Sequence, residues 1–594
     1  MPSSFWFIVS NSALFCGLVH ISDWDFLYKY TVGFDAEHLP EDAALSEGFA
    51  EYVKGEYDGT PKTPEWASRI CGAPAEDITW YARLIGKENA VMIMNTYAPA
   101  RNRGAENYPQ MAMTIGLMGG HMFKPGHATG ISYHRNAGNT GPTLAIQGST
   151  AQPYVVNMCP DTITSIELWP AVLNGTYHNV GAGWGNFTPI EERAIDIHMI
   201  YHDNYAYLQT GVNIMDGIKA HRKVDFVCTK AMFLTTQAMY SDIVLPVTTM
   251  WERPGGMDGS NREALIVWQQ VTEPLYEAKS DQEIEILLMK KLGIDPAKAY
   301  TLSEKAQFFN QLRTCTYLNP SYQMLPICTI TQEDIDEWGV AEELKAANIE
   351  IAPQEGAVPL KEFLERGCYT VPRQEGDGYY SLAYNWAKFM QDPDANPLPS
   401  ASGKFEIYCQ AKADLMNHMF PGPEVKPYPN YLVPNEGYET TFKEGNPDGK
   451  KGEYPYLVYN PHYLRRSHST YDNVPWLREA CPNPVFLSAA DAKEKNIETG
   501  DTVLIYNKWG EILRQVSVVE TIMPGVIAVP HGSWLDLDEE TGIDRGGSDN
   551  VLCGPITSNV SVAGYNNHNC NFEKYDGEAL VPDCEKPQRI LAFD

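Results

Sequence analysis

Several features that would place the protein in a particular class are scarce or absent from its sequence. The 12 cysteines form no C-x-x-C pair, which excludes a local zinc or iron–sulfur cassette. Basic residues are also scarce, because 45 Lys and Arg stand against 76 Asp and Glu and the formal net charge is −31. Binding to nucleic acid needs clustered positive charge, so this composition argues against a nucleic-acid partner.

A long hydrophobic run is missing as well. The stretch 5–21 is apolar, but Ser10, Asn11 and Ser12 interrupt it. It is shorter than the roughly 20 residues that cross a bilayer, and no Lys or Arg precedes it. It therefore matches neither a membrane span nor a signal peptide, and we expect a helix whose apolar face packs into a larger core.

What the sequence does contain is an alternation of helix and strand patterns. At 594 residues, of which 43% are hydrophobic, the chain is long enough for three or four domains. Residues 63–72 carry a capping Thr, a first-turn Pro and a closing Gly, which predict a helix. The apolar run 91–94 predicts a buried strand and residues 111–118 predict a further helix, so a first α/β unit is expected.

The same alternation returns in a second α/β unit. Strands are predicted at 197–201, 224–227 and 243–245, with a helix over 214–220. The segment 280–283, Ser-Asp-Gln-Glu, has the form of a capping box and predicts the start of another helix. The strand at 243–245 is a short apolar run ended by a proline, and we expect it to be buried on both faces.

The loop after that strand has the composition of a ligand site. In open parallel sheets, ligands lie beyond the carboxyl ends of the strands. Residues 248–256, TTMWERPGG, supply hydroxyls, glycine N–H groups and charges at such a place. The simpler interpretation of Glu252 and Arg253 is a solvated ion pair within the loop.

After about Tyr454 the pattern becomes rich in strands. Residues 501–519 predict a hairpin that turns at Lys-Trp-Gly, and 526–529 predict a further strand. A helix is expected only at 489–495 in this part. A separate β-domain, most simply a barrel, is therefore predicted to close the chain.

These patterns divide the chain into five parts. Long irregular stretches lie between the α/β units and before the barrel, and we expect lids or channel walls there. The predicted parts are a partial α/β domain over 1–133, an irregular insertion over 134–195, a second α/β nucleotide-binding domain over 196–295, an irregular connecting region over 296–450 and a C-terminal β-barrel domain over 451–594.

One arginine pair stands out in this acidic chain. Arg465 and Arg466 directly precede Ser467, His468, Ser469 and Thr470. Two guanidiniums, an imidazole and several hydroxyls in one loop are the groups that a buried pyrophosphate or a pterin needs. The loop is therefore a candidate anion-binding site.

Seven motifs in sequence order carry a resemblance to a known family. The motifs are TPEWASRI, SDIVLPVTTMWER, PSASGKFEIY, HSTYDN, GDTVLIYNKWGE, PGVIAVPHGSW and DRGGSDNVL. Together they resemble the dimethyl sulfoxide reductase family of molybdopterin oxidoreductases, from about Trp24 to the C-terminus. The resemblance implies two related Rossmann-like α/β domains, the first of them incomplete here, and a C-terminal β-barrel of the double-psi type that binds the molybdopterin dinucleotide.

The resemblance also implies a cofactor and residues that contact it. The cofactor is bis(molybdopterin guanine dinucleotide) with molybdenum, whose nucleotides lie at the strand ends of the α/β domains. Tyr97 and Arg101 lie where the family has substrate contacts, although Gly104 and Ala105 depart from its pattern. The implied cofactor-binding residues are Asn204, Lys230, Thr235, Thr248, Glu252, Arg253, Arg466, His468, Ser469, Thr470, Asn550, Asn566 and Asn567.

The family pattern further implies an N-terminal segment that none of these seven motifs represents. Family members begin with an iron–sulfur or related segment and then carry the protein ligand to molybdenum, so we assign no metal ligand here and expect an iron–sulfur cluster only in such a part or in a partner subunit. An iron–sulfur electron-transfer subunit and a membrane anchor subunit are the implied partners. A periplasmic location, or the outer face of the cytoplasmic membrane, is expected for the full-length protein after twin-arginine export, although this chain shows no such signal.

The expected function is therefore that of the C-terminal part of a molybdenum oxidoreductase catalytic subunit. Its small-molecule oxidised substrate is expected to be a sulfoxide or N-oxide used in anaerobic respiration. Reductive dehydroxylation of a phenolic substrate is an alternative within the family. A different class of function, a non-catalytic cofactor-binding fragment, also stays open.

Overall fold

The structure is a computed structural model of the chain. It describes residues 22–589 except 96–100, 103–106, 123, 125, 133–142, 160, 180–189, 204–205, 260–262, 375–386, 420–422, 438, 442–450, 557–562 and 567. The expected helix within 5–21 lies outside the described residues. Among those residues, none of the helices combines the length and the hydropathy needed to span a membrane.

The first lobe is built around a parallel β–α–β unit. Strands β2 (Met92–Asn95) and β3 (Ala128–Ser132) pair in parallel, and α6 (Tyr108–Met118) connects them. The predicted helix start is confirmed, because the Thr63 hydroxyl accepts a hydrogen bond from the Trp66 N–H at 3.2 Å. The remaining elements of this part are α2 (Trp24–Tyr30), β1 (Thr31–Val32), α3 (Phe49–Lys54), α4 (Pro64–Cys71) and α5 (Ala75–Leu84).

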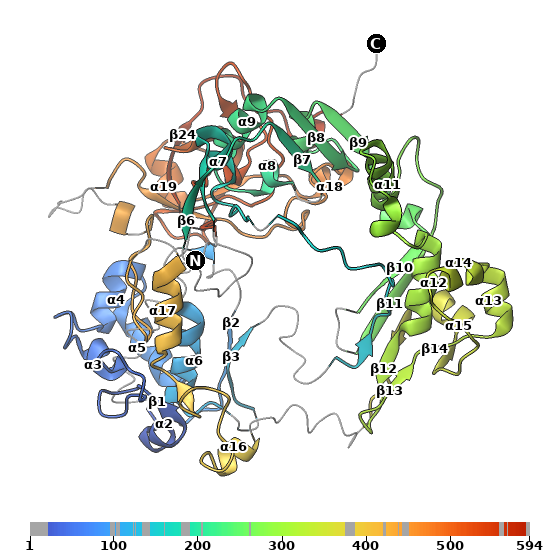
Figure 1. The fold of residues 1–594 in the computed structure, drawn as a ribbon. Coiled ribbons are helices and arrows are strands. Elements are labelled where there is room, and N and C mark those ends of the chain that lie inside the picture. The colour runs from blue at the N-terminus through green and yellow to red at the C-terminus, as the bar shows by residue number, and fades with distance from the viewer. Residues whose placement is uncertain are drawn as a thin grey trace.

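A segment far along the sequence completes this lobe. Strand β17 (Phe405–Glu406) pairs in parallel with β1, and α16 (Ala387–Gln391) and α17 (Gln410–Met419) lie beside the N-terminal helices (Figure 1). Phe389 and Tyr408 are buried in the same hydrophobic core as Phe26. The first lobe therefore needs residues from the region that was expected to be an irregular connection.

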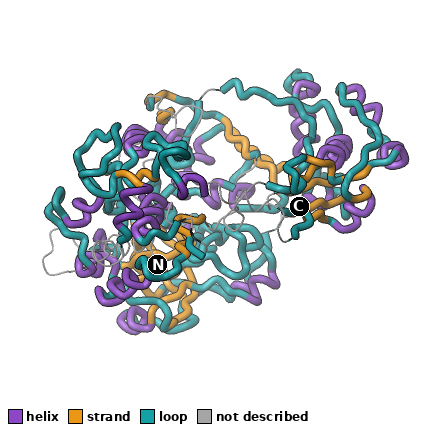
Figure 2. Tube along the Cα trace, turned by 90° about the horizontal axis from the view of Figure 1, so that it is seen from below, coloured by secondary structure: helices purple, strands orange, loops and turns teal. Residues whose placement is uncertain are grey.

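A second lobe is formed largely by the rest of that region, which differs from the expected irregular structure. Its core gathers Phe308, Phe309 and Phe363 on helices whose apolar positions repeat at helical spacing. In Figure 2, loops make up much of the trace between the helices. The elements are β4 (Ala145–Ile146), β10 (Gly255–Asp258), β11 (Ala264–Gln269), α11 (Asp281–Lys291), α12 (Glu304–Thr314), β12 (Thr316–Leu318), β13 (Met324–Pro326), β14 (Cys328–Thr329), α13 (Gln332–Trp338), α14 (Ala341–Ala346), β15 (Val358–Pro359), α15 (Leu360–Arg366) and β16 (Cys368–Thr370).

The second α/β unit is a parallel three-stranded sheet in the order β7-β8-β9. The predicted alternation is confirmed, with boundaries displaced by up to four residues. The expectation that the strand at 243–245 is buried on both faces is wrong, because β9 pairs only with β8 in the described sheet and Ile243 is 47% exposed. The elements are α7 (Leu168–Asn174), β5 (Thr176–Asn179), β6 (Glu191–Ala194), β7 (Met199–His202), α8 (Tyr207–Thr210), α9 (Ile214–Lys223), β8 (Phe226–Ala231), α10 (Thr236–Met239) and β9 (Ile243–Pro246).

The predicted C-terminal barrel is confirmed. Within the described residues six strands form a closed ring in the order β19-β22-β18-β24-β20-β21, and β21 pairs back to β19. Ile214 and Ile218 of α9 pack into the barrel core, so the second α/β unit and the barrel share one apolar interior. The elements are β18 (Tyr456–Tyr459), α18 (Pro475–Ala480), β19 (Val485–Ser488), α19 (Ala489–Glu494), β20 (Thr502–Asn507), β21 (Gly510–Val519), β22 (Val526–Ala528), β23 (Ile543–Asp544) and β24 (Asn569–Lys574).

Candidate functional site

The loop that carries the arginine pair forms a tight turn after β18. Ser467 and Thr470 exchange both backbone hydrogen bonds, at 3.3 and 3.0 Å. His468 inside the turn has φ +54°, in the left-handed region that non-glycine residues rarely adopt. Such backbone strain persists only where the surroundings hold it, and it is common at functional sites.

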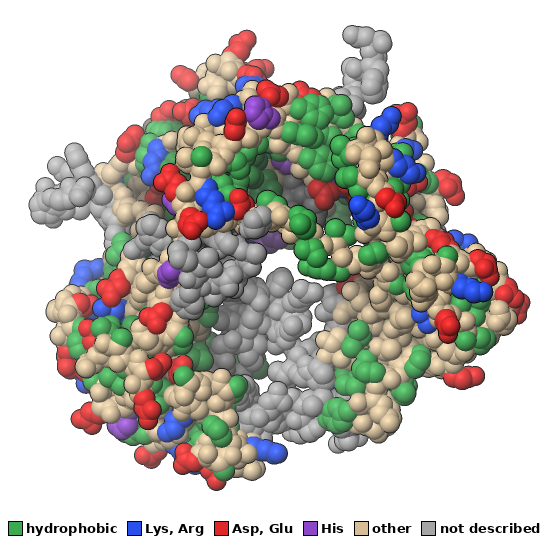
Figure 3. All heavy atoms as spheres, viewed as in Figure 1, with side chains coloured by type: hydrophobic (Ala, Val, Ile, Leu, Met, Phe, Trp, Pro, Cys, Tyr) green, Lys and Arg blue, Asp and Glu red, His purple; other side chains and the backbone are tan. Residues whose placement is uncertain are grey.

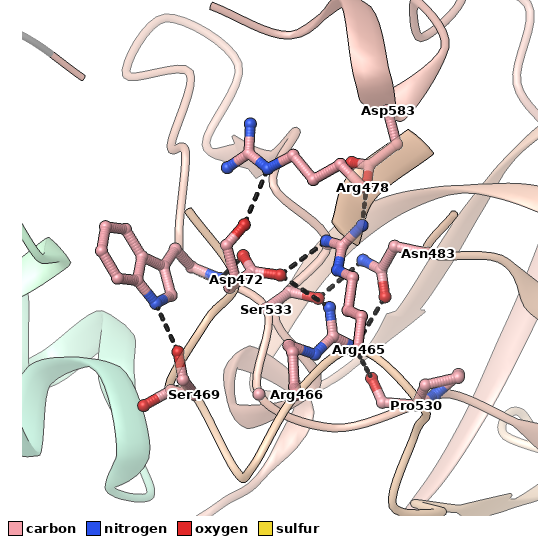
Figure 4. A network of polar contacts seen from close by, with 12 residues as sticks. Arg465, Arg466, Ser469, Asp472, Arg478, Asn483, Pro530, Ser533 and Asp583 are labelled. Carbon is pink, nitrogen blue, oxygen red and sulfur yellow. Dashed lines mark hydrogen bonds and ion pairs between the residues drawn. The ribbon is translucent and has the colours of Figure 1, made fainter. Parts of the chain in front are cut away.

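Both arginines are buried beneath this turn rather than offered to a ligand (Figure 4). The Arg465 guanidinium donates to Asp472 at 2.6 Å and also pairs with Asp583. Arg466 donates to the same Asp472 carboxylate at 2.8 Å and to the Asn483 side-chain oxygen at 2.8 Å. The charges that suggested an anion site are therefore compensated inside the barrel.

The Asp472 carboxylate is the centre of this network. Burial alone would raise its pKa, but the charges of Arg466 and Arg465 outweigh burial and hold the pKa well below its usual range. The backbone N–H of Trp534 donates to the other carboxylate oxygen of Asp472 at 2.9 Å. The network thus joins the loop at 465–472 to the segment around 534 through a charged group that stays ionised.

Three histidines lie together above the network. Nδ1 of His468 is 3.2 Å from Nε2 of His531, and the His462 ring centroid lies 5.0 Å from that of His468 and 4.4 Å from that of His531. Of these three, the sequence motifs indicated only His468. His531 lies within the quoted motif PGVIAVPHGSW and His462 precedes the arginine pair by three residues, but spacing alone gives no reason to bring these two together.

The predicted substrate-side arginine reaches the same place from the first lobe. The backbone N–H of Asn566 donates to the Arg101 carbonyl at 3.1 Å. Partial desolvation lowers the pKa of His468, and the nearby His462 and the positive charge of Arg101 lower it further. The structure thus brings Arg101, His468 and Asn566 together, whereas Tyr97 and Asn567 lie outside the described residues.

Asn550 joins the barrel to the second α/β unit. It lies in the 3-10 turn η7 (Asp549–Leu552), and its side-chain amide donates to the backbone carbonyls of Gly211 at 2.7 Å and Thr210 at 3.2 Å. Those carbonyls lie at the C-terminal end of α8. The predicted pterin-side residue therefore has a structural partner in the described residues.

A second polar cluster lies at the carboxyl ends of β7 and β8. Lys230 Nζ pairs with Asp203, with Asp281 at 3.2 Å and with Glu285 at 3.1 Å. Burial alone would lower the pKa of Lys230, but the hydrogen bonds that its ammonium donates to these carboxylates raise the pKa above its ordinary value. The cluster is acidic on balance and half open, because the side chains of Asp203 and Asp281 are 62% and 44% exposed. The neighbouring Asn204 lies outside the described residues.

The predicted loop after β9 contributes to the same cluster. Arg253 donates to Thr248 Oγ1 at 3.0 Å and pairs with Asp281 at 2.5 Å. Glu252 does not pair with Arg253, as its carboxylate accepts the backbone N–H groups of Thr249 at 2.6 Å and Leu275 at 2.7 Å. A cavity of about 340 Å³ opens beside this loop, and its lining includes Thr248, Arg253, Gly255, Glu304, Gln307 and Phe308.

Thr235 stands apart from that cluster. Its hydroxyl accepts the Ala238 N–H at 3.3 Å and caps α10. A capping role explains the residue type without a ligand. Its predicted contact with a nucleotide stays a prediction.

Comparison with protein families gives two matches. A family model described as "Molybdopterin oxidoreductase" matches residues 46–291, and one described as "Molydopterin dinucleotide binding domain" matches residues 456–569. The second range contains five of the six barrel strands and the first residue of β24. The first contains the β–α–β unit and the three-stranded sheet.

Curated relatives are similar along nearly all of this chain. "Dimethyl sulfoxide reductase DmsA" of Escherichia coli (strain K12) is 30% identical over 566 residues, which cover 91% of this chain and 61% of that protein. "Dimethyl sulfoxide/trimethylamine N-oxide reductase" of Cereibacter sphaeroides is 29% identical, with 98% and 65% covered. The chain thus spans less than two thirds of the length of these relatives.

A solved structure is similar in fold. "Acetylene Hydratase from Pelobacter acetylenicus" superposes with a TM-score of 0.55 at 15% identity, covering 95% of this chain and 70% of that one. At this identity the likeness concerns the fold alone. It includes both α/β parts and the barrel, because nearly the whole chain is covered.

Proposed function

Because the chain belongs to the dimethyl sulfoxide reductase family of molybdopterin oxidoreductases, we propose that it forms part of a catalytic subunit that reduces a sulfoxide or N-oxide in anaerobic respiration. Relatives named for dimethyl sulfoxide and trimethylamine N-oxide support this substrate class. The structural observation that supports the proposal is that Arg101 lies beside His468 and Asn566. This polar site joins the first lobe to the barrel.

The residues at this place fit a molybdopterin dinucleotide, which when bound supplies two-electron oxygen-atom transfer. His468 and Thr470 are exposed and Ser469 is half-buried, so an imidazole and hydroxyls are available to a polar heterocycle. Asn460 Oδ1, at the end of β18, is buried without a hydrogen-bond partner among the described residues. A buried acceptor without a donor is costly, and a ligand N–H would satisfy it.

Arg466 has a positioning role in this proposal. Its Nε donates to the backbone carbonyl of His531 at 3.0 Å while its terminal nitrogens hold Asp472 and Asn483. The side chain thereby fixes the loop that carries His468 against the loop that carries His531. We propose that it supports the cofactor through this loop and not by direct contact.

A second dinucleotide is proposed at the acidic cluster beyond β7 and β8, in the guanine form. Guanine presents N–H donors on one edge, and carboxylates such as Asp203 and Asp281 are the matching acceptors. The cations Lys230 and Arg253 hold these carboxylates in place from behind. Asn204 follows β7 in the sequence and Thr235 follows β8, and both stay in the proposed contact set.

The finer features of the assembly are part of the same proposal. We propose that the six-stranded barrel is of the double-psi type. An iron–sulfur electron-transfer subunit and a membrane anchor are the proposed partners, because buried molybdenum needs an electron relay. Action at the periplasmic face of the membrane is proposed with them.

The test uses the full-length gene product, since this chain spans only part of its relatives. Molybdenum, pterin and guanine nucleotide are measured after anaerobic purification, and oxidation of a reduced viologen is followed with a sulfoxide, an N-oxide and a catechol. We expect cofactor and activity with the first two acceptors. His468→Ala should lower activity about tenfold, the equivalent of one lost hydrogen bond of about 1.4 kcal/mol.

The matched control is His178→Ala, an exposed histidine that pairs with Glu167 at 2.6 Å away from the site. It should leave cofactor content and activity unchanged. Activity with catechol alone would replace the proposed substrate class by reductive dehydroxylation. A purified protein without pterin would contradict the enzymatic proposal.

A further inference from the structure

Two buried cysteines lie side by side in the core of the second lobe, and neither is part of the proposed cofactor sites. Cys315 directly follows α12 and Cys328 begins β14. Both residues are completely inaccessible to solvent. Their Sγ atoms are 3.8 Å apart, and within the part of the chain that the structure describes no other two cysteine sulfurs are in contact.

The backbone holds the two cysteines together. The N–H of Ile327, the residue before Cys328, donates to the Cys315 carbonyl at 3.1 Å. The chain between them forms the hairpin of β12 and β13, and Gln354 Nε2 donates to the Cys328 carbonyl at 2.9 Å. A disulfide bond of about 2.05 Å requires the Sγ atoms to approach by about 1.8 Å, a distance that rotation about the two Cα–Cβ bonds can supply.

The surroundings offer the pair little other chemistry. The Cys315 thiol donates to the Leu312 carbonyl at 3.2 Å, and the neighbouring side chains belong to the apolar core of the lobe. No third metal-ligating side chain joins the two sulfurs among the described residues, and two thiolates alone do not complete a zinc site. The hydrogen bond with Cys315, together with burial, raises the pKa of Cys328, so the closed core keeps this group as an unreactive thiol.

We propose that Cys315 and Cys328 form an intramolecular disulfide when the second lobe folds or opens in the presence of a disulfide oxidant. The thiolate of one cysteine attacks the S–S bond of the oxidant, which breaks, so that a mixed disulfide forms and one thiolate leaves. The thiolate of the other cysteine then attacks the protein sulfur of the mixed disulfide and releases the second oxidant thiolate. Two electrons pass from the cysteines to the oxidant, and the two thiol protons end on the released thiols.

The bond would join the end of α12 to β14 across the base of the β12–β13 hairpin. The two cysteines are 13 positions apart, so the bond closes a short loop and restricts the unfolded chain. We expect it to raise the folded-to-unfolded ratio of the lobe by roughly 100-fold. The proposal does not depend on the proposed cofactor or substrate, because both reacting sulfurs lie in this core.

The experiment uses the full-length gene product and the fact that both cysteines lie on one tryptic peptide. Trypsin cleaves after Arg313 and Lys345, and residues 314–345 contain no other cysteine. The protein is equilibrated with an excess of oxidised glutathione in urea just below its unfolding transition, where the core opens often enough for the oxidant to enter. Free thiols are then alkylated in acid-quenched, denatured samples, and peptide masses are measured. We expect peptide 314–345 to lack two hydrogens and to carry no alkyl group, and to become doubly alkylated after treatment with dithiothreitol.

The exposed Cys368 is the internal control for the oxidant. It is the single cysteine of tryptic peptide 367–373 and should carry glutathione. A peptide 314–345 that keeps both thiols, or carries glutathione itself, while Cys368 is modified would overturn the proposal. These masses come from the unchanged protein, so they decide the question even if a variant fails to fold.

Urea unfolding of the oxidised protein supplies a second measurement. Dithiothreitol should lower the midpoint of the transition that contains the second lobe, and it should have no such effect on Cys328→Ala. Cys570→Ala is the matched control, since Cys570 is equally buried in the barrel core and contacts no other described cysteine sulfur. It should keep the full response to dithiothreitol. An equal response in Cys328→Ala would show that the stabilising bond lies elsewhere.

Discussion

The barrel and the second α/β sheet each hold a cluster of cations and carboxylates, but the two clusters are built differently. In the barrel, Arg465, Arg466 and Asp472 are almost wholly inaccessible. At the sheet edge, Lys230 is buried but the carboxylates around it reach solvent. The barrel cluster therefore acts as an internal support, and the sheet-edge cluster is the one that still presents charge to a ligand.

The overall charge of the chain does not reveal which of the two clusters is buried and which is open to a ligand. Acidic side chains are scattered over much of the described surface in Figure 3, in keeping with the net charge of −31. An arginine pair in such a chain suggests an anion site until its internal partners are known. Charged groups become available to ligands only where the fold leaves them incompletely paired.

The largest effect is expected from breaking the barrel cluster at its centre. Asp472→Asn leaves the buried Arg465 and Arg466 without their shared counter-charge, and we expect a loss of about 3–5 kcal/mol in the free energy of unfolding. Urea unfolding of the transition that contains the barrel measures this. Asp501→Asn is the matched control, since Asp501 pairs with Lys574 at 2.8 Å near the surface. Equal costs for the two substitutions would show that burial does not distinguish the clusters.

A smaller, pH-dependent effect is expected beside the sheet edge, where His202 and His221 form a buried pair. Their Nε2 atoms are 2.8 Å apart, and His221 Nδ1 lies 2.7 Å from the Gly217 carbonyl oxygen. Burial, with a contribution from His221, lowers the pKa of His202 to about 3. In the unfolded chain His202 binds a proton near pH 6.5, whereas in the folded chain it stays neutral to a lower pH. Its contribution to the free energy of unfolding is therefore complete above pH 6.5 and is lost as the pH falls.

Between pH 6.5 and pH 5 the loss should be about 2 kcal/mol. The measurement compares urea unfolding of the unchanged chain and of His202→Gln across this interval. Glutamine keeps an N–H donor toward His221 but cannot titrate, so the variant should lose less stability on acidification. Parallel pH profiles for both proteins would contradict the assignment.

The sequence predicts these regions unequally. The β–α–β alternation, the Ser280 capping box and the hairpin at 501–519 follow from local patterns, and the structure confirms them. The pairing of β1 with β17, about 370 positions apart, cannot be predicted in this way, because nothing local in residues 31–32 specifies a distant partner. Contacts of this kind depend on the whole fold.

The candidate site shows the same limit. The sequence motifs indicate His468 as a cofactor-binding residue, which stays a prediction. They give no sign that Arg466 is structural, because Asp472 and Asn483 reach it only after the barrel closes. His462 and His531 were missed since they belong to different loops. Residue types predict chemistry, whereas the partners of each group decide whether that chemistry is available.

A third prediction concerns the open cluster. Lys230→Met removes the cation shared by Asp203, Asp281 and Glu285, and we expect a loss of about 1–2 kcal/mol, because these carboxylates can turn toward water. Lys230→Arg should recover most of it. Unfolding at low and at high salt separates the two clusters: 1 M salt should reduce the cost of Lys230→Met and leave that of Asp472→Asn unchanged. Salt sensitivity of both would contradict the distinction.

The smallest effect is expected where an ion pair is neither buried nor shared. Lys574, whose side chain is 55% exposed, pairs with Asp501 between β24 and β20, whose register is already fixed by their backbone ladder. The hydrogen bond from Lys574 lowers the pKa of Asp501, so the pair contributes above the ordinary pKa of the carboxyl and is lost on acidification. Solvent screening limits that contribution, and Lys574→Ala should cost less than about 1 kcal/mol at pH 7. Urea unfolding at pH 7 and pH 3 measures it, and the difference between the variant and the unchanged chain should be smaller at the lower pH. A cost that approaches that of Asp472→Asn, or one that is undiminished at pH 3, would mean that the strands rely on this pair, and the ranking of clusters by burial would fail.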